Sequence, residues 1–125
     1  MEKIKNFERK YGEITCGDIV FFRFGWDKKY GQRTIWKTGR EFRWRRGSIF
    51  KKKGVKAIGC DCLALDAYGS TNPNHSFLLG NGVNILENVD KLYELPEIFS
   101  VIGLGCKFKN GSGAPIRLIA LTDKK

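Results

Sequence analysis

The apolar residues of this chain lie in short runs separated by glycine and polar residues, and no uninterrupted apolar run is longer than Ile19–Phe22. A helix that spans a bilayer needs about 20 predominantly apolar residues, so no segment is expected to cross a membrane. Short β-branched and aromatic runs bounded by turn residues are typical of buried strands. The chain has 125 residues, which is enough for one hydrophobic core, and we expect a single domain over residues 1–125.

The pattern predicts helices interspersed with strands. Helices are predicted where apolar residues recur at helical spacing before a glycine, at residues 2–11, 44–53 and 75–79. Strands are predicted in the short apolar runs, at residues 19–22, 55–60, 83–86, 99–108 and 115–121. Polar, aperiodic loops are predicted at residues 26–39 and 68–74. The last two strands flank a glycine-rich turn and should form a hairpin, which predicts an α/β domain with a mixed sheet.

Cysteine usage and charge limit the classes of protein that the chain can belong to. The four cysteines are dispersed without a Cys-x-x-Cys pair, which indicates neither a zinc finger nor a disulfide scaffold. The first residues carry scattered charges instead of a signal peptide, so a reducing, cytoplasmic location is expected. The formal net charge of +10 is large enough to attract polyanions, which keeps nucleic acid among the possible partners.

Four stretches of the chain carry a family resemblance. They are ITCGDIVFFRFGWDKKYG, GVKAIGCDCLALD, NHSFLLGNGVNILENV with the following KLYELP, and FKNGSGAPIRLIALTD. In order and spacing they resemble the C-terminal half of the cyclase family, which includes kynurenine formamidases (arylformamidases) and isatin hydrolases. The resemblance implies a swivelling β/β/α fold, here in an incomplete version. It also implies a metal-dependent hydrolase that acts on amide or cyclic amide C–N bonds.

The resemblance also implies roles for particular residues. His75 occupies the place of a family histidine that binds metal and serves in catalysis, and Glu87 occupies the place of a carboxylate that binds the metal, which is usually zinc or manganese. Trp26 lies in the turn that would form a wall of the substrate pocket. The family's main motif, His-x-Gly-Thr-His-x-Asp-x-Pro-x-His, has no counterpart before Ile14. We therefore expect a truncated or split enzyme, a separately encoded N-terminal half as partner, and a homo- or hetero-oligomer.

The residues alone leave other interpretations open for these positions. His75 could be a polar residue at a helix start and Glu87 a solvated strand end, because one histidine and one glutamate define no metal motif. Cys62, with Asp66 and His75, could form a cysteine nucleophile system. Small cysteines at a strand end are more often buried, and Asp61 and Asp66 are expected to orient loops or accept backbone hydrogen bonds.

A basic, aromatic segment is the alternative site. It could bind single-stranded nucleic acid, since cations neutralise phosphates and aromatic rings stack on bases. It could equally be a solvated basic helix whose aromatic residues face the core, because no known nucleic-acid-binding motif accompanies it. The residues concerned are Arg40, Arg43, Arg45, Arg46, Lys51, Lys52 and Lys53, interleaved with Phe42, Trp44 and Phe50.

Overall fold

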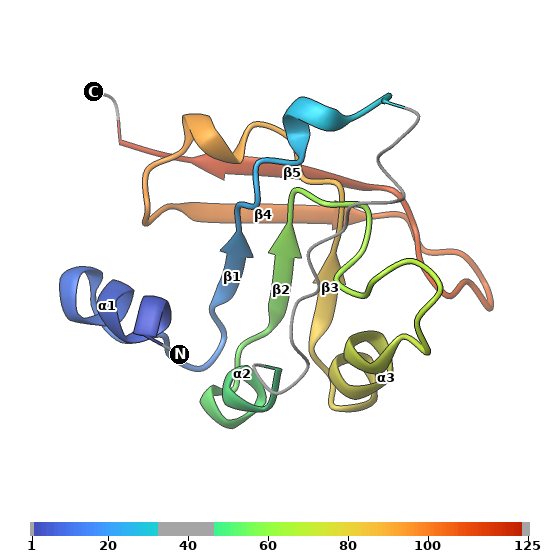
Figure 1. Cartoon of the computed structure of the whole chain (residues 1–125), viewed down its shortest axis with the longest axis horizontal. Helices are drawn as coiled ribbons and strands as arrows, with labels where there is room; N and C mark the ends of the chain where they lie inside the picture. Colours follow the sequence, from blue (N-terminus) through green and yellow to red (C-terminus); the bar gives the residue numbers. More distant parts are fainter. Residues whose placement is uncertain (1, 33–46, 124–125) are drawn as a thin grey trace. The chain divides into compact units, whose positions relative to one another are not determined.

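The computed structural model describes residues 2–32 and 47–123 (Figure 1). The chain divides into two compact units, residues 1–93 and residues 94–125. The expectation of a single domain stays a prediction. No helix within the described ranges is long and apolar enough to cross a membrane.

The first unit is built on a parallel sheet in the order β1-β2-β3. Its strands are β1 (Ile19–Phe22), β2 (Ala57–Cys60) and β3 (Asn84–Leu86). Val20 pairs with Ile58, and Ile58 pairs with Ile85 on the other side. Parallel sheets are normally covered on both faces, and each residue of the central strand β2 is buried, as that arrangement requires.

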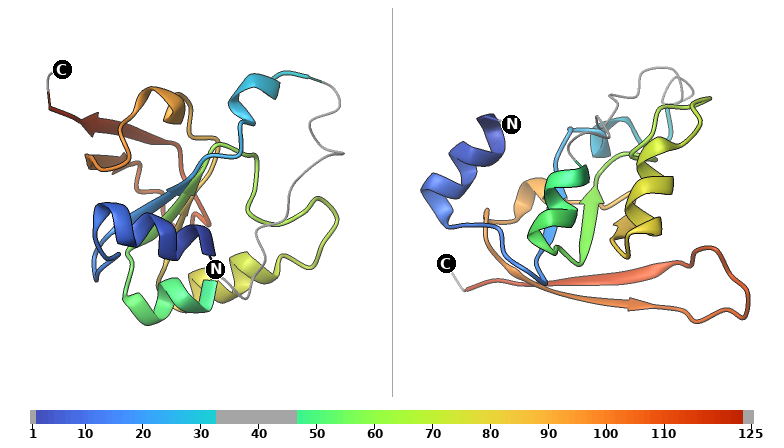
Figure 2. Two further views of the ribbon diagram at one scale, coloured as in Figure 1. Left: turned by 60° about the vertical axis from the view of Figure 1, so that its left-hand side comes forward. Right: turned by 90° about the horizontal axis from the view of Figure 1, so that it is seen from below.

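Each strand of this sheet follows a helix in the chain. Helix α1 (Glu2–Tyr11) precedes β1, α2 (Gly47–Lys53) precedes β2 and α3 (Pro73–Gly80) precedes β3. Helices α2 and α3 contact each other near the start of the strands, and α3 also packs against β3 (Figure 2). A short 3-10 helix, η1 (Asp27–Lys29), follows β1.

The hydrophobic core lies between the sheet and these helices. Phe50, Ile58 and Leu78 are fully buried, and they come from α2, β2 and α3 respectively. Gly59 is required by this packing, because a Cβ at its position would lie 2.3 Å from the ring of Phe21. The glycine therefore allows the Phe21 ring to lie directly against β2.

The second unit is a two-stranded antiparallel hairpin of β4 (Ser100–Gly105) and β5 (Ile116–Leu121), preceded by the 3-10 helix η4 (Leu92–Glu94) at the unit boundary. Ile102 pairs directly with Ile119, so their side chains share one face of the hairpin. Both are more than 40% exposed, at 44% and 42%. An isolated two-stranded hairpin is marginally stable in water, so burial of these apolar side chains would add to the stability of the hairpin.

The structure confirms the predicted α/β class, with both parallel and antiparallel strand pairs. These pairs occur in two separate sheets rather than in one mixed sheet. The helix predicted over 75–79 begins earlier, at Pro73, because proline suits the first turn of a helix. Residues 44–46 of the predicted basic helix and residues 33–39 of the predicted loop lie outside the described ranges, and η1 occupies part of the remaining loop.

Candidate active site

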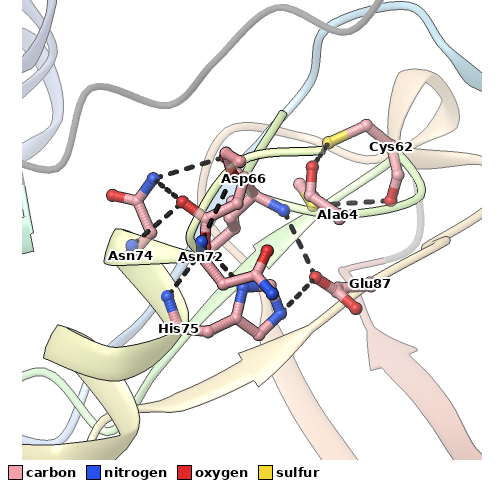
Figure 3. Close-up of polar contacts among 10 residues, drawn as sticks. Cys62, Ala64, Asp66, Asn72, Asn74, His75 and Glu87 are labelled. Atoms are coloured by element: carbon pink, nitrogen blue, oxygen red, sulfur yellow. Dashed lines mark hydrogen bonds and ion pairs between the residues drawn. The ribbon is translucent and has the colours of Figure 1, made fainter. Parts of the chain in front are cut away.

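Three segments meet at the edge of the sheet where the parallel strands end. One is the loop after β2, with Leu65 and Asp66. The second is the first turn of α3, with Asn74 and His75. The third is Glu87, the residue directly after β3 (Figure 3). In α/β proteins this edge is the usual position of a binding site, because loops from several strands converge there.

Asp66 connects the loop after β2 to the start of α3. Its Oδ1 accepts hydrogen bonds from the backbone N–H of Asn74 (2.9 Å) and from Asn74 Nδ2 (2.6 Å). Its Oδ2 accepts one from the backbone N–H of His75 (2.9 Å) and lies 2.6 Å from His75 Nδ1. Asp66 thus caps the helix from outside it, in place of Asn72, which makes no side-chain capping bond.

The pKa of Asp66 reflects these contacts. Burial raises the pKa of the carboxyl group, but hydrogen bonds from His75 and Asn74 lower it by more, so the net shift is downward. The ionised carboxylate is therefore the form that the folded chain stabilises.

The imidazole of His75 lies between two carboxylates. Its Nε2 is 3.1 Å from Oε1 of Glu87, while its Nδ1 faces Asp66. The same Oε1 of Glu87 accepts a hydrogen bond from the backbone N–H of Leu65 at 3.2 Å. A neutral imidazole carries only one N–H, so one ring nitrogen would direct a lone pair at a carboxylate unless a positive charge lies there. A cation bound between the two groups would accept that lone pair.

The two side chains fit part of a metal site. Ligand atoms at zinc–nitrogen and zinc–oxygen distances are about 3.4 Å apart in a tetrahedral site, close to the Nε2 to Oε1 separation here. A catalytic zinc ordinarily has three protein ligands. In the part of the chain that the structure describes, no group of three or more His, Cys, Asp or Glu residues could hold a metal ion.

Comparisons with known proteins identify the family of this chain. Residues 1–67, which make up more than half of the chain, match the sequence profile described as putative cyclase. The chain belongs to the cyclase family. Isatin hydrolase from Roseibium aggregatum is 29% identical over 136 residues, a match that covers 97% of this chain and 51% of that protein. This cyclase-family chain thus spans about half the length of the curated relative it matches.

Solved structures show the same fold. An isatin hydrolase bound to the product analogue thioisatinate matches with a TM-score of 0.87 and 26% identity, over 98% of this chain and 52% of that chain. Isatin hydrolase A from Ralstonia solanacearum matches with a TM-score of 0.84 and 22% identity, over 98% of this chain and 52% of its own. The predicted cyclase-family fold is confirmed. That the match is to the C-terminal half of the family fold stays a prediction. His75 and Glu87 follow the stretch that matches the family profile, and the roles predicted for them stay predictions.

Within this cyclase-family chain, His75 and Glu87 are not the isolated polar residues that their spacing alone allowed. They touch each other, as a shared cation site requires. Asp66 accepts backbone hydrogen bonds, as predicted, and it also contacts the His75 ring, with which the sequence pattern grouped it only in the cysteine nucleophile alternative. The role of the Leu65 backbone was missed, because a main-chain N–H leaves no signal in residue identity.

The turn that contains Trp26 is held in place by another carboxylate, that of Asp61. Asp61 accepts hydrogen bonds from the backbone N–H groups of Phe24 (2.8 Å), Gly25 (2.7 Å) and Trp26 (3.1 Å). This ties the turn after β1 to the end of β2, as predicted for a loop-orienting aspartate. Trp26 is only 5% exposed and belongs to the core cluster, so little of its ring is free to contact a ligand. Its substrate-binding role stays a prediction.

The cysteines near the site are buried. This agrees with the prediction that they are structural residues of a strand end and not nucleophiles. Cys60 and Cys62 are 0% and 7% exposed, and Cys62 Sγ donates to the carbonyl oxygen of Ala64 at 3.1 Å. Hydrogen bonding with Cys62 and burial raise the pKa of Cys60. Both ring nitrogens of His75 face carboxylates, so the geometry does not provide Cys62 with a histidine base.

The basic segment is described only in part. Arg40, Arg43, Arg45 and Arg46 lie outside the described residues. Lys51 and Lys52 are exposed on α2, but Lys53 Nζ lies 2.6 Å from Glu8 Oε1, and this hydrogen bond lowers the pKa of Glu8. Phe50 is fully buried and cannot stack on a base. Nucleic-acid binding by Arg43, Arg45, Arg46, Lys51, Lys52 and Lys53 stays a prediction.

Proposed function

We propose that this chain supplies part of the active site of a metal-dependent hydrolase that cleaves amide or cyclic amide C–N bonds. His75 and Glu87 would bind one divalent cation, zinc or manganese. The observation that carries the proposal is the 3.1 Å approach of His75 Nε2 to Glu87 Oε1. The two groups come from different elements and are placed by separate hydrogen bonds, one to Asp66 and one to Leu65.

The cation would lower the pKa of a bound water, or polarise the substrate carbonyl, so that hydrolysis proceeds near neutral pH. His75 would bind through Nε2, because Nδ1 is already directed at Asp66. Glu87 would bind the cation through its carboxylate, and the hydrogen bond from the Leu65 N–H restricts the rotation of that carboxylate. Of the two roles predicted for His75, this geometry favours metal binding over proton transfer.

The remaining ligands would come from polypeptide outside these residues, either another part of a longer protein or a separate chain. Two donors fall short of the three that a catalytic zinc takes. The matched isatin hydrolase structure is about twice as long, since this chain covers 52% of it. The exposed pair Ile102 and Ile119 gives such a polypeptide an apolar surface to cover.

Manganese-induced broadening of the NMR signals of His75 tests the cation site. The sequence has one histidine, so its ring signals are unambiguous, and paramagnetic broadening detects even weak binding. Mn²⁺ should broaden them in the wild type, and Glu87→Gln should weaken the effect at least about tenfold. Glu13→Gln, which removes an exposed carboxylate elsewhere, should leave it unchanged. Equal broadening in wild type and Glu87→Gln would overturn the proposal.

Hydrolysis is tested by joining the chain to a polypeptide that carries a His-x-Gly-Thr-His type motif. Isatin is the probe, because the relatives are isatin hydrolases. Metal-dependent opening of isatin that is lost in Glu87→Gln and kept in Glu13→Gln would support the reaction class. Activity that survives in Glu87→Gln would contradict the role of this residue.

A further inference from the structure

Asp66 makes the closer and more enclosed of the two contacts to the His75 ring. The Asp66 Oδ2 to Nδ1 distance is 2.6 Å, against 3.1 Å between Glu87 Oε1 and Nε2. The side chain of Asp66 is 2% exposed and that of Glu87 is 27% exposed. A charge-assisted hydrogen bond is stronger when it is short and shielded from water. The single proton of a neutral imidazole is therefore favoured at Nδ1.

The orientation of Asp66 is determined by donors on all sides. Oδ1 receives the backbone N–H and Nδ2 of Asn74, and Oδ2 receives the backbone N–H of His75 beside the ring contact. Rotating the carboxylate away from the ring would leave these donors without their acceptor. The ring contact is thus maintained by the same residue that caps α3.

We infer that Asp66 is a positioning residue that holds the neutral His75 in the tautomer with its proton on Nδ1. The lone pair of Nε2 then points toward Glu87, where a cation can accept it. The consequence for metal binding rests on the function proposed above, whereas the assignment of the tautomer is independent of that function.

An asparagine at this position would reverse the tautomer. An amide has one acceptor oxygen, so its NH₂ group must face either the two donors of Asn74 or the His75 side. If the NH₂ group faces Asn74, it lies against two buried donors. If it faces His75, it lies against only the backbone N–H of His75 and can donate to Nδ1, which moves the ring proton to Nε2. The second orientation has fewer unsatisfied groups and removes the lone pair that a cation would use.

The ¹⁵N spectrum of the sole histidine in the metal-free chain tests the inference directly. At a pH where the ring is neutral, the wild type should show a protonated Nδ1, and Asp66→Asn should show a protonated Nε2. Asn74→Ala is the matched control, since it removes one partner of Asp66 but leaves both bonds to His75. It should lower stability without changing the tautomer. Mn²⁺ affinity should fall roughly 10- to 100-fold in Asp66→Asn, the usual effect of losing a ligand's supporting hydrogen bond.

Two results would overturn the inference: a neutral wild-type ring protonated on Nε2, or a folded Asp66→Asn variant that keeps the proton on Nδ1. The wild-type spectrum decides the matter even if Asp66→Asn does not fold. A wild-type ring with the proton on Nδ1 that Mn²⁺ fails to broaden would leave the tautomer assignment standing and contradict the proposed cation site instead.

Discussion

The backbone N–H of Leu65 donates a hydrogen bond to Oε1 of Glu87, so the loop after β2 holds a carboxylate that follows β3. The next residue, Asp66, holds His75 at the start of α3. Two consecutive residues of one loop therefore place both proposed metal ligands. The site is preorganised by main-chain and side-chain bonds before any cation binds, which reduces the cost of ordering the ligands.

Removing the carboxylate of Asp61 should destabilise the fold. Asp61→Ala leaves the backbone N–H groups of Phe24, Gly25 and Trp26 without their acceptor. Unsatisfied buried donors cost about 1–3 kcal/mol each, so a loss of at least that size is expected in urea unfolding. Asp90→Ala, at an exposed position, should change stability by less than about 1 kcal/mol. Equal stability of Asp61→Ala and wild type would contradict this role.

A side chain at Gly59 should be poorly tolerated. Gly59→Ala would place Cβ 2.3 Å from Phe21 Cδ1, so the ring or the strand must move. Overpacking of this kind costs about 1–3 kcal/mol, measurable as a lower unfolding midpoint. Gly105→Ala is the control, because nothing lies within 4 Å of the added Cβ there. Combining Gly59→Ala with Phe21→Leu should recover part of the loss, and no recovery would argue against the ring contact as its cause.

The stability of the fold should fall in acid, in part because Asp66 becomes protonated. Burial raises the pKa of this carboxyl group, but the hydrogen bonds from His75 and Asn74 lower it by more, so the net pKa lies below its ordinary value. Its contribution to stability is therefore full above the unfolded pKa, about 4, and is lost as the pH falls through the lower folded value. Unfolding measured between about pH 5 and pH 2 should show a shallower decline in Asp66→Asn than in wild type. An identical decline of stability with pH in the two proteins would contradict this contribution of Asp66.

The exposed face of the hairpin should matter for association more than for folding. Ile102 and Ile119 are paired across β4 and β5 and are largely exposed. Replacing both with threonine keeps β-branched side chains and should change stability by less than about 1 kcal/mol. Binding to a polypeptide that corresponds to the other half of the family fold should weaken, as measured by calorimetry. The double variant Lys107→Gln/Lys109→Gln, at exposed positions beyond β4, is the control, and equal weakening in both would indicate a charge effect instead.

Local pattern was sufficient for most of the elements. The alternation of short apolar runs with glycine predicted α1, β1 and the β4–β5 hairpin at nearly their observed bounds, because these depend on propensity and turn residues close in sequence. The distribution of strands into a parallel and an antiparallel sheet was not predictable in this way. It depends on which strands pair across long separations.

The sequence by itself determined the family, through the order of its motifs, and it selected His75 and Glu87 as the residues to consider. Only the tertiary structure decided that their side chains meet, since α3 and β3 bring them together at one edge of the sheet. It also decided that Asp66 and the Leu65 N–H hold them there. The physical reason is that a hydrogen bond between distant segments depends on the path of the folded backbone, and residue identity alone does not specify that path.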